Sequence, residues 1–124
     1  MVESFLEKIK EMLYQVEERF GIVELFAVLK MDEITDKWSI IVGSSWVNDE
    51  NRKEVFGLLI DLMRKRLDDE ERYSIARIGI LNSREHLVEL MLEEFKSDQS
   101  ITDDRKVNGN IIHEGFILKS EKQQ

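Results

Sequence analysis

Four polar residues lie close together where a predicted strand gives way to a predicted helix: Ser44, Ser45, Asn48 and Asp49. Their hydroxyl, amide and carboxylate groups could serve a small-molecule or metal-dependent enzyme, and backbone amides at a helix start can hold phosphate. However, neither serine has the flanking glycines of a nucleophile elbow, and no lysine follows at nucleotide-loop spacing. Asp49 and Glu50 would also repel an anion there. We therefore expect Gly43, Ser44 and Ser45 to seat a packed helix, and we keep the enzyme site as the alternative.

The two histidines, His86 and His113, predict no metal site. They lack the spacing that places two ligands on one helix face. His113 and Glu114 are neighbours in a predicted strand, so their side chains point to opposite faces of the sheet. We expect a structural or surface role for each histidine.

The acidic residues likewise predict no metal site and no cofactor site. Asp32, Glu33 and Asp36 belong to the loop before the tryptophan-containing strand, whereas Asp49 follows its other end. A strand rises about 3.3 Å per residue, so the two groups lie too far apart to share one ion. Loop solvation accounts for the first group, and charge complementarity at a helix N-terminus accounts for the second.

Composition favours one folded domain over residues 1–124, with a polar tail at 120–124. The chain is 42% hydrophobic and has no cysteine, which excludes disulfides and thiolate chemistry. No apolar run reaches the ~20 residues of a membrane-spanning helix, and the first residues do not resemble a signal peptide, so a cytoplasmic protein with no membrane association is predicted.

The net charge of −8 makes nucleic-acid binding unlikely, because an acidic surface repels phosphate. The densest basic run, Arg64-Lys65-Arg66, falls where a helix is predicted to end. Cations stabilise that end of the helix dipole, which is the simpler explanation.

Residues 38–46 predict the most distinctive strand, Trp38-Ser39-Ile40-Ile41-Val42-Gly43-Ser44-Ser45-Trp46. Alternation places both tryptophans on one face and mostly small residues on the other. An apolar run at 22–31 precedes it across a short polar connection, which predicts an antiparallel hairpin.

Three helices are predicted around these strands. Residues 2–20 show the three- and four-residue spacing of an amphipathic helix. A second helix follows Asn48-Asp49-Glu50-Asn51 and is expected to be heavily buried, Phe56 included. A third is capped by Asn82 or Ser83 and presents a wide apolar arc; Asn82 with Glu85 fits a capping box.

The remaining segments complete the pattern. Residues 68–72 are predicted to be a solvated connection, and residues 74–81 a third strand. Residues 97–106 are polar and predicted to be mobile. Asn108-Gly109 is a hairpin-turn signal before a last strand at 111–118, which Glu114-Gly115 is expected to interrupt.

The order α-β-β-α-β-α-β predicts an α+β domain. Its mixed sheet has four to five strands, is opened by an antiparallel hairpin and is covered by three helices. The strand–helix–strand segment after the hairpin should place two strands parallel.

Three segments together resemble a small prokaryotic family of uncharacterised domains: the strand ending Ser44-Ser45-Trp46, the segment 76–82, and the closing segments 108–112 and 116–120. The resemblance covers about residues 22–120. It implies a compact single domain whose last segment is ordered, and it implies no activity, so no catalytic residue is carried over.

The preferred functional prediction is a small non-enzymatic interaction or assembly domain that self-associates, most simply as a homodimer. It is based on the surplus of apolar helix surface and on the lack of a convergent polar set. The enzyme site near Ser44, Ser45, Asn48 and Asp49 is the alternative, and nucleic-acid binding through Arg64-Lys65-Arg66 is a third hypothesis.

Overall fold

The computed structural model describes residues 2–32 and 34–123. Its elements run in the order α1 (Val2–Phe20), β1 (Leu25–Met31), β2 (Ile34–Ser44), α2 (Arg52–Arg66), α3 (Asp69–Tyr73), β3 (Ile75–Asn82), α4 (His86–Glu94), β4 (Gln99–Ile101), β5 (Arg105–Val107) and β6 (Asn110–Ser120). The first helix has the bounds that its apolar spacing predicts.

The strands form one mixed sheet in the order β3-β2-β1-β6-β4, and β5 also pairs with β6. The β1–β2 hairpin is antiparallel and β2 and β3 are parallel, both as predicted. The α+β class and the mixed sheet are therefore confirmed. The described residues form six strands and four helices, where four to five strands and three helices were predicted.

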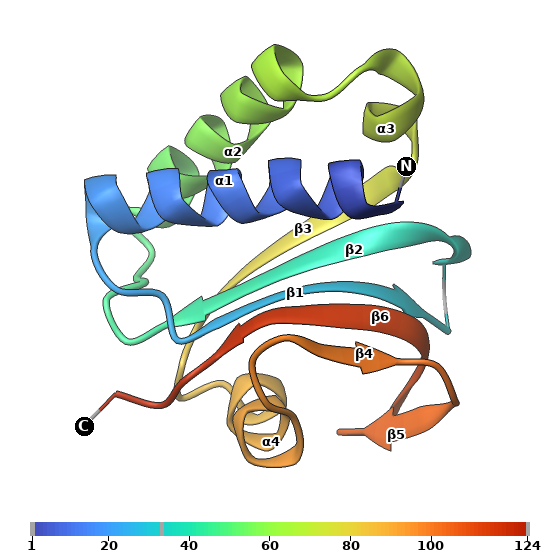
Figure 1. Cartoon of the computed structure of the whole chain (residues 1–124). Helices are drawn as coiled ribbons and strands as arrows, with labels where there is room; N and C mark the ends of the chain where they lie inside the picture. The colour runs from blue at the N-terminus through green and yellow to red at the C-terminus, as the bar shows by residue number, and fades with distance from the viewer. Residues whose placement is uncertain (1, 33, 124) are drawn as a thin grey trace.

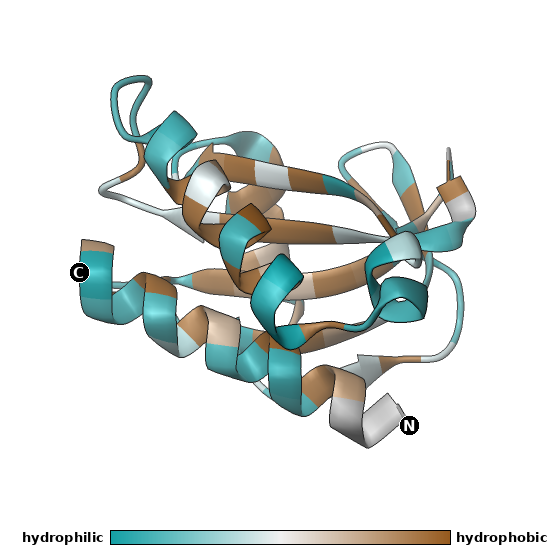
Figure 2. Ribbon diagram, turned by 90° about the horizontal axis from the view of Figure 1, so that it is seen from above, coloured by the Kyte–Doolittle hydropathy of each residue, from teal (hydrophilic) through white to brown (hydrophobic). Residues whose placement is uncertain are grey.

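Two layers cover the sheet. Helices α1 and α2 lie on one face, and α4 lies on the other face beside β4 and β5 (Figure 1). Seen from the side of α1 and α2, hydrophobic residues line the strands, and much of the outer helix surface is hydrophilic (Figure 2). Within the described residues, no helix has the length and apolarity needed to cross a membrane.

The central strand β1 supplies side chains to both layers. Phe26 and Val28 are buried in the cluster beneath α1 and α2, whereas Leu25, Ala27 and Leu29 are buried in the cluster that includes α4. A strand covered on both faces reads as a continuous apolar run, which explains the composition of residues 22–31. The strand itself begins at Leu25, after a short connection.

Both tryptophans pack on the α1–α2 side of the sheet, as their alternation predicts. Trp38 stacks on Phe5 with ring centroids 6.3 Å apart, and Trp46 stacks on Phe20 at 5.5 Å. The strand ends at Ser44, however, so Trp46 lies in the following turn. Its indole Nε1–H donates to the Ile22 carbonyl at 2.8 Å, which fixes the ring beside the end of α1.

The small-residue face of β2 is a packing seat, that is, a surface on which a helix packs closely, as the sequence predicts. A Cβ added to Gly43 would lie 2.7 Å from Cγ1 of Val88, a fully buried residue of α4. No real Cβ tolerates so short a contact, so glycine is required here for the helix to approach the sheet. A helix of the same chain therefore covers this position.

Two helix predictions are corrected. Residues 68–72 are not only a solvated connection, because Asp68 and Glu71 form a reciprocal capping box that starts the short helix α3. The predicted capping box of Asn82 and Glu85 is wrong. Asn82 ends β3, and Glu85 is the N-cap of α4 without a side-chain cap bond.

The C-terminal third is more strand-rich than predicted. The polar segment 97–106 contains β4 and most of β5, which pair with β6. Asn108 and Gly109 both have positive φ (52° and 79°), as their turn signal predicts. Glu114-Gly115 does not interrupt the last strand, because β6 continues through it. Gly115 instead allows a close approach to β1, where an added Cβ would lie 2.9 Å from the Val28 carbonyl oxygen.

The contact between Gly43 and Val88 predicts a coupled effect on stability. We expect Gly43→Ala to lower the free energy of unfolding by about 1–3 kcal/mol through overpacking. In the Val88→Ala background the same substitution should have a smaller effect, with a coupling of about 1 kcal/mol in a double-mutant cycle measured by urea unfolding. Gly57→Ala is the matched control. Nothing lies within 4 Å of its added Cβ, so it should stabilise α2 by ~0.5–1 kcal/mol. A Gly43→Ala variant as stable as the wild type would contradict the packing seat.

Candidate interaction surface

The outer edge of β3 is an open edge of the sheet. Nearly every residue of β1 is buried, but of the eight residues of β3 only Ile80 is. β3 pairs with β2 on one side, and it is the last strand in the sheet order on the other. The opposite edge of the sheet is made of β4 and β5, each only three residues long. A short strand is one of the ways in which proteins blunt an edge, and β3 is not blunted in this way.

The backbone groups along this edge alternate between β2 and the outside. Ser83 donates its backbone N–H to the Ser44 carbonyl at 3.1 Å, so the groups of Leu81, Gly79 and Arg77 also face β2. Those of Ile78 and Ile80 then face outward. The Ile80 carbonyl accepts from Arg52 Nε on α2 at 2.9 Å, which agrees with that direction. Ile78 therefore presents both its N–H and its carbonyl at the open edge.

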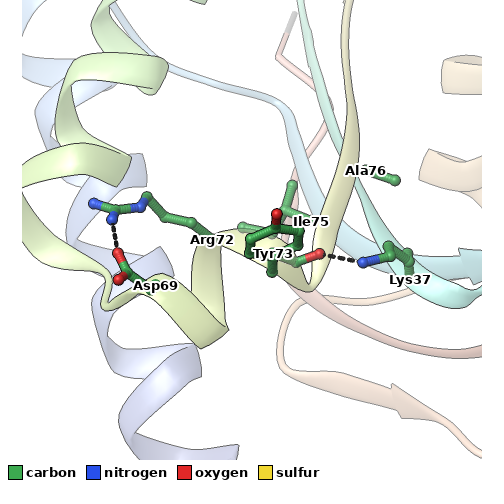
Figure 3. A pocket seen from close by; sticks show the side chains of 6 residues that line it. All are labelled: Lys37, Asp69, Arg72, Tyr73, Ile75 and Ala76. Carbon is green, nitrogen blue, oxygen red and sulfur yellow. Dashed lines mark hydrogen bonds and ion pairs between the residues drawn. The ribbon is translucent and has the colours of Figure 1, made fainter.

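Two hollows lie beside the edge, one next to α3 and the other next to α2. The first hollow, of about 560 Å³, is lined by Lys37, Asp69, Arg72, Tyr73, Ile75 and Ala76. Lys37 reaches from β2 to donate to the Tyr73 carbonyl at 2.6 Å, and its ammonium lies 5.4 Å from the centre of the Tyr73 ring. Arg72 pairs with Asp69 beside them (Figure 3). The Tyr73 side chain is 78% exposed, a large value for an aromatic residue.

The second hollow, of about 420 Å³, lies beside the C-terminal half of β3. It is lined by Asp49, Arg52, Lys53, Phe56, Ile78 and Ile80. Arg52 connects the turn before α2 to β3, because it pairs with Asp49 at 2.7 Å while its Nε donates to the Ile80 carbonyl. The prediction that Phe56 is buried is wrong. This side chain is 45% exposed, whereas Val55 and Leu59 supply the core contacts of α2.

We call the outer edge of β3 and these two hollows the edge groove. Together the two hollows contain four cations (Lys37, Arg72, Arg52, Lys53) and two carboxylates (Asp69, Asp49). β3 itself contains no acid and one cation, Arg77, whose Nε lies 3.3 Å from Ser39 Oγ. The groove is thus an apolar, slightly basic surface on a chain of net charge −8.

The four residues singled out as a possible enzyme site do not form one constellation. Ser44 is fully buried and its Oγ donates to the Ile22 carbonyl at 2.7 Å. Ser45 is exposed and its backbone N–H donates to Glu24. Asn48 Oδ1 accepts the backbone N–H groups of Glu50 and Asn51, which organises the turn before α2.

Asp49, the last of the four, is exposed and belongs to the second hollow. These four residues therefore do not form the convergent set of groups that the enzyme prediction needs.

Glu24 is a buried acid that the sequence reading passed over. It is 3% exposed, and its carboxylate accepts the backbone N–H groups of Ser45 and Gln123, each at 2.9 Å. These charge-assisted bonds offset its desolvation and join the turn after β2 to the segment after β6. A lone acid in an otherwise apolar run was the available signal.

His113 bridges two turns. Its Nδ1 lies 2.9 Å from an oxygen of Asp104, in the β4–β5 turn, and its Nε2 lies 3.1 Å from an oxygen of Asp32, after β1. Glu114 points elsewhere and pairs with Lys30, as the alternation of the strand predicts. Hydrogen bonds from both ring nitrogens require the charged imidazolium. The bond to Asp104, followed by the bond to Asp32, raises the pKa of His113 above its ordinary value of 6.5.

The predicted loop acids are dispersed. Asp32 contacts His113, Asp36 lies within β2, and Glu33 falls outside the described residues. Across the described part of the chain, no group of three or more His, Asp or Glu side chains has the arrangement of a metal site. His86 is exposed at the start of α4.

The basic run Arg64-Lys65-Arg66 occupies the last turn of α2, where it was expected. Lys65 pairs with Asp61 at 3.1 Å, and Arg66 pairs with Glu11 of α1 at 2.9 Å. Two of the three cations thus have carboxylate partners within the chain, in keeping with a helix-end role.

No family model matches this chain, and no curated protein or solved structure is detectably similar to it. The resemblance to a prokaryotic domain family stays a prediction from the sequence. The edge groove and the His113 bridge therefore have to be interpreted from their own geometry.

The His113 bridge predicts a loss of stability at alkaline pH. The folded pKa is raised, so the stabilisation is fully present below about pH 6.5 and is lost as the pH rises through the folded pKa. We expect the urea midpoint of the wild type to fall between pH 6 and pH 9, and His113→Gln to remove this pH-dependent part. His86→Gln, at an exposed histidine, is the control and should keep the wild-type profile. A wild-type profile that is flat over this range would contradict the bridge.

Proposed function

We propose that this protein is a small non-enzymatic interaction domain that self-associates as a homodimer through the edge groove. The observation that carries the proposal is the unpaired outer edge of β3, an eight-residue strand flanked by exposed Phe56 and Tyr73. The shortness of β4 at the other end of the sheet leaves β3 as the better template for a further strand.

Backbone chemistry favours a strand as the partner. A protein strand placed beside β3 would satisfy the outward N–H and carbonyl of Ile78 and extend the sheet by one ladder. Each satisfied pair contributes about 0.5–1.5 kcal/mol, so the backbone gives direction but little affinity by itself. Most of the affinity has to come from apolar side chains that are removed from water.

The edge groove offers such side chains. Phe56, Tyr73, Ile75 and Ile78 are all at least partly exposed beside the open edge. Aromatic residues in this setting commonly act as anchors of protein interfaces. The wide apolar arc of α4 is a weaker candidate, because Val88 and Met91 are already buried against the sheet.

Charge also favours the edge groove as the contact between two copies. Two chains of net charge −8 repel each other, and the repulsion is least where carboxylates are fewest. β3 contains none, and the hollows beside it carry four cations and two carboxylates. Two copies can therefore approach edge to edge.

The proposal predicts a dimer whose stability depends on Phe56. We expect light scattering after size exclusion to give twice the mass of one chain at tens of micromolar protein. Phe56→Ser should weaken the dimer by about tenfold or more in dissociation constant, because an aromatic anchor contributes about 1.4 kcal/mol or more. Analytical ultracentrifugation over a concentration series measures the dissociation constants of the wild type and of the Phe56→Ser variant.

Tyr14→Ser is the matched control. Tyr14 is 54% exposed, and it lies on α1 and lines neither hollow, so its loss should leave the dissociation constant unchanged. A wild type that stays monomeric at these concentrations would refute self-association. Equal weakening by both substitutions would place the interface elsewhere.

A further inference from the structure

We infer that two copies pair β3 to β3 in antiparallel orientation, with Ile78 of each copy directly opposite Ile78 of the other. The inference rests on the proposed self-association and gives it a geometry. A closed homodimer has a two-fold axis, and an axis perpendicular to the sheet makes identical edge strands antiparallel. The residue on the axis then faces its own counterpart, and only the register has to be found.

The backbone of β3 selects the register. Trp38 pairs with Ile75 and Ser39 pairs with Arg77, so Ala76 is an extra, bulged residue without a partner on β2. At the other end, the Ile80 carbonyl is occupied by Arg52. Ile78 is the residue between these two features, and both of its outward groups are available. With Ile78 on the axis, the Ile78 N–H of each copy donates to the Ile78 carbonyl of the other.

Side chains favour the same register. With Ile78 on the axis, Arg77 lies opposite Gly79 of the second copy, which has no side chain to collide with it. An axis through Arg77 would set two arginines directly opposite each other, and like charges in that position are destabilising. An axis through Gly79 would direct the Ile78 N–H to the Ile80 carbonyl, the oxygen that Arg52 already binds. An axis through Ile78 keeps the central exchange clear of that oxygen, which is met only at the outer pair with the bulged Ala76.

This arrangement also uses the hollows. The antiparallel orientation places the first hollow of each copy beside the second hollow of the other. Tyr73 of one copy and Phe56 of the other then lie at the same end of the paired strands. The carboxylates Asp69 and Asp49 lie on opposite halves of each groove, so that each can face cations of the other copy.

Because the chain has no cysteine, single-cysteine variants test the register directly. Directly opposite residues of a hydrogen-bonded antiparallel pair have Cα atoms about 5.5 Å apart, within the range of a disulfide. Ile78→Cys should therefore form a disulfide-linked dimer under mild oxidation, read on a non-reducing gel. Circular dichroism and thermal melting verify that the variant is folded.

Ala76→Cys is the matched control on the same strand. Ala76 is more exposed than Ile78, so random collision would cross-link it at least as readily. In the inferred register its two copies lie four residues apart along the strands, or ~13 Å, which excludes a disulfide. We expect at least tenfold less cross-linked product from Ala76→Cys than from Ile78→Cys at equal concentration.

Hydrogen exchange of the unmodified protein gives a second measurement. The backbone amide of Ile78 should exchange more slowly as the protein concentration rises, whereas the amide of Asn108, in an exposed turn, should not change. A light-scattering dimer with neither an Ile78→Cys disulfide nor this protection would overturn β3 pairing and leave self-association standing. Cross-linking of Ala76→Cys in place of Ile78→Cys would overturn the register. A monomer would overturn both.

Discussion

The fold depends on burying the central strand β1 on both faces. Its side chains alternate between two hydrophobic clusters, and each cluster needs its own covering layer. Helices α1 and α2 supply one layer, and α4 with the β4–β5 segment supplies the other. Gly43 lets α4 approach the sheet closely, and Gly115 lets β6 approach β1 within the sheet. The polar Glu24 is tolerated at the start of β1 because backbone amides satisfy it.

The same constraint explains why β3 is left open. Coverage is concentrated on β1 and its neighbours, so the outermost strand of the parallel pair lies at the margin of both layers. At the other margin β4 and β5 are each three residues long. The edge groove is thus where the core ends. Its partial protection by the Ala76 bulge and by Arg52 leaves a single interval at Ile78 where a further strand fits.

Much of the fold follows from local patterns, because the relevant signals are local. The spacing of apolar residues in 2–20 defines α1, and the strand–helix–strand order after the hairpin gives the parallel β2–β3 pair. The helix α3 was missed because five polar residues have no apolar periodicity, although Asp68 and Glu71 carried its capping signal. β4 and β5 were missed because each buries only one side chain, Ile101 and Val107.

The candidate surface could not be predicted in the same way. Which strand lies at the edge depends on whether the last strand joins β1 or β3, a choice made by tertiary packing. The four residues of the possible enzyme site are close in sequence but have different roles in the fold. The Ser44 hydroxyl is buried, Asn48 organises a turn, and Asp49 lines the edge groove. Finally, the pairing of Leu25 with Ser120 joins positions 95 residues apart. The central strand therefore gains its second neighbour only through a long-range closure, which is slow compared with the closing of the local β1–β2 hairpin.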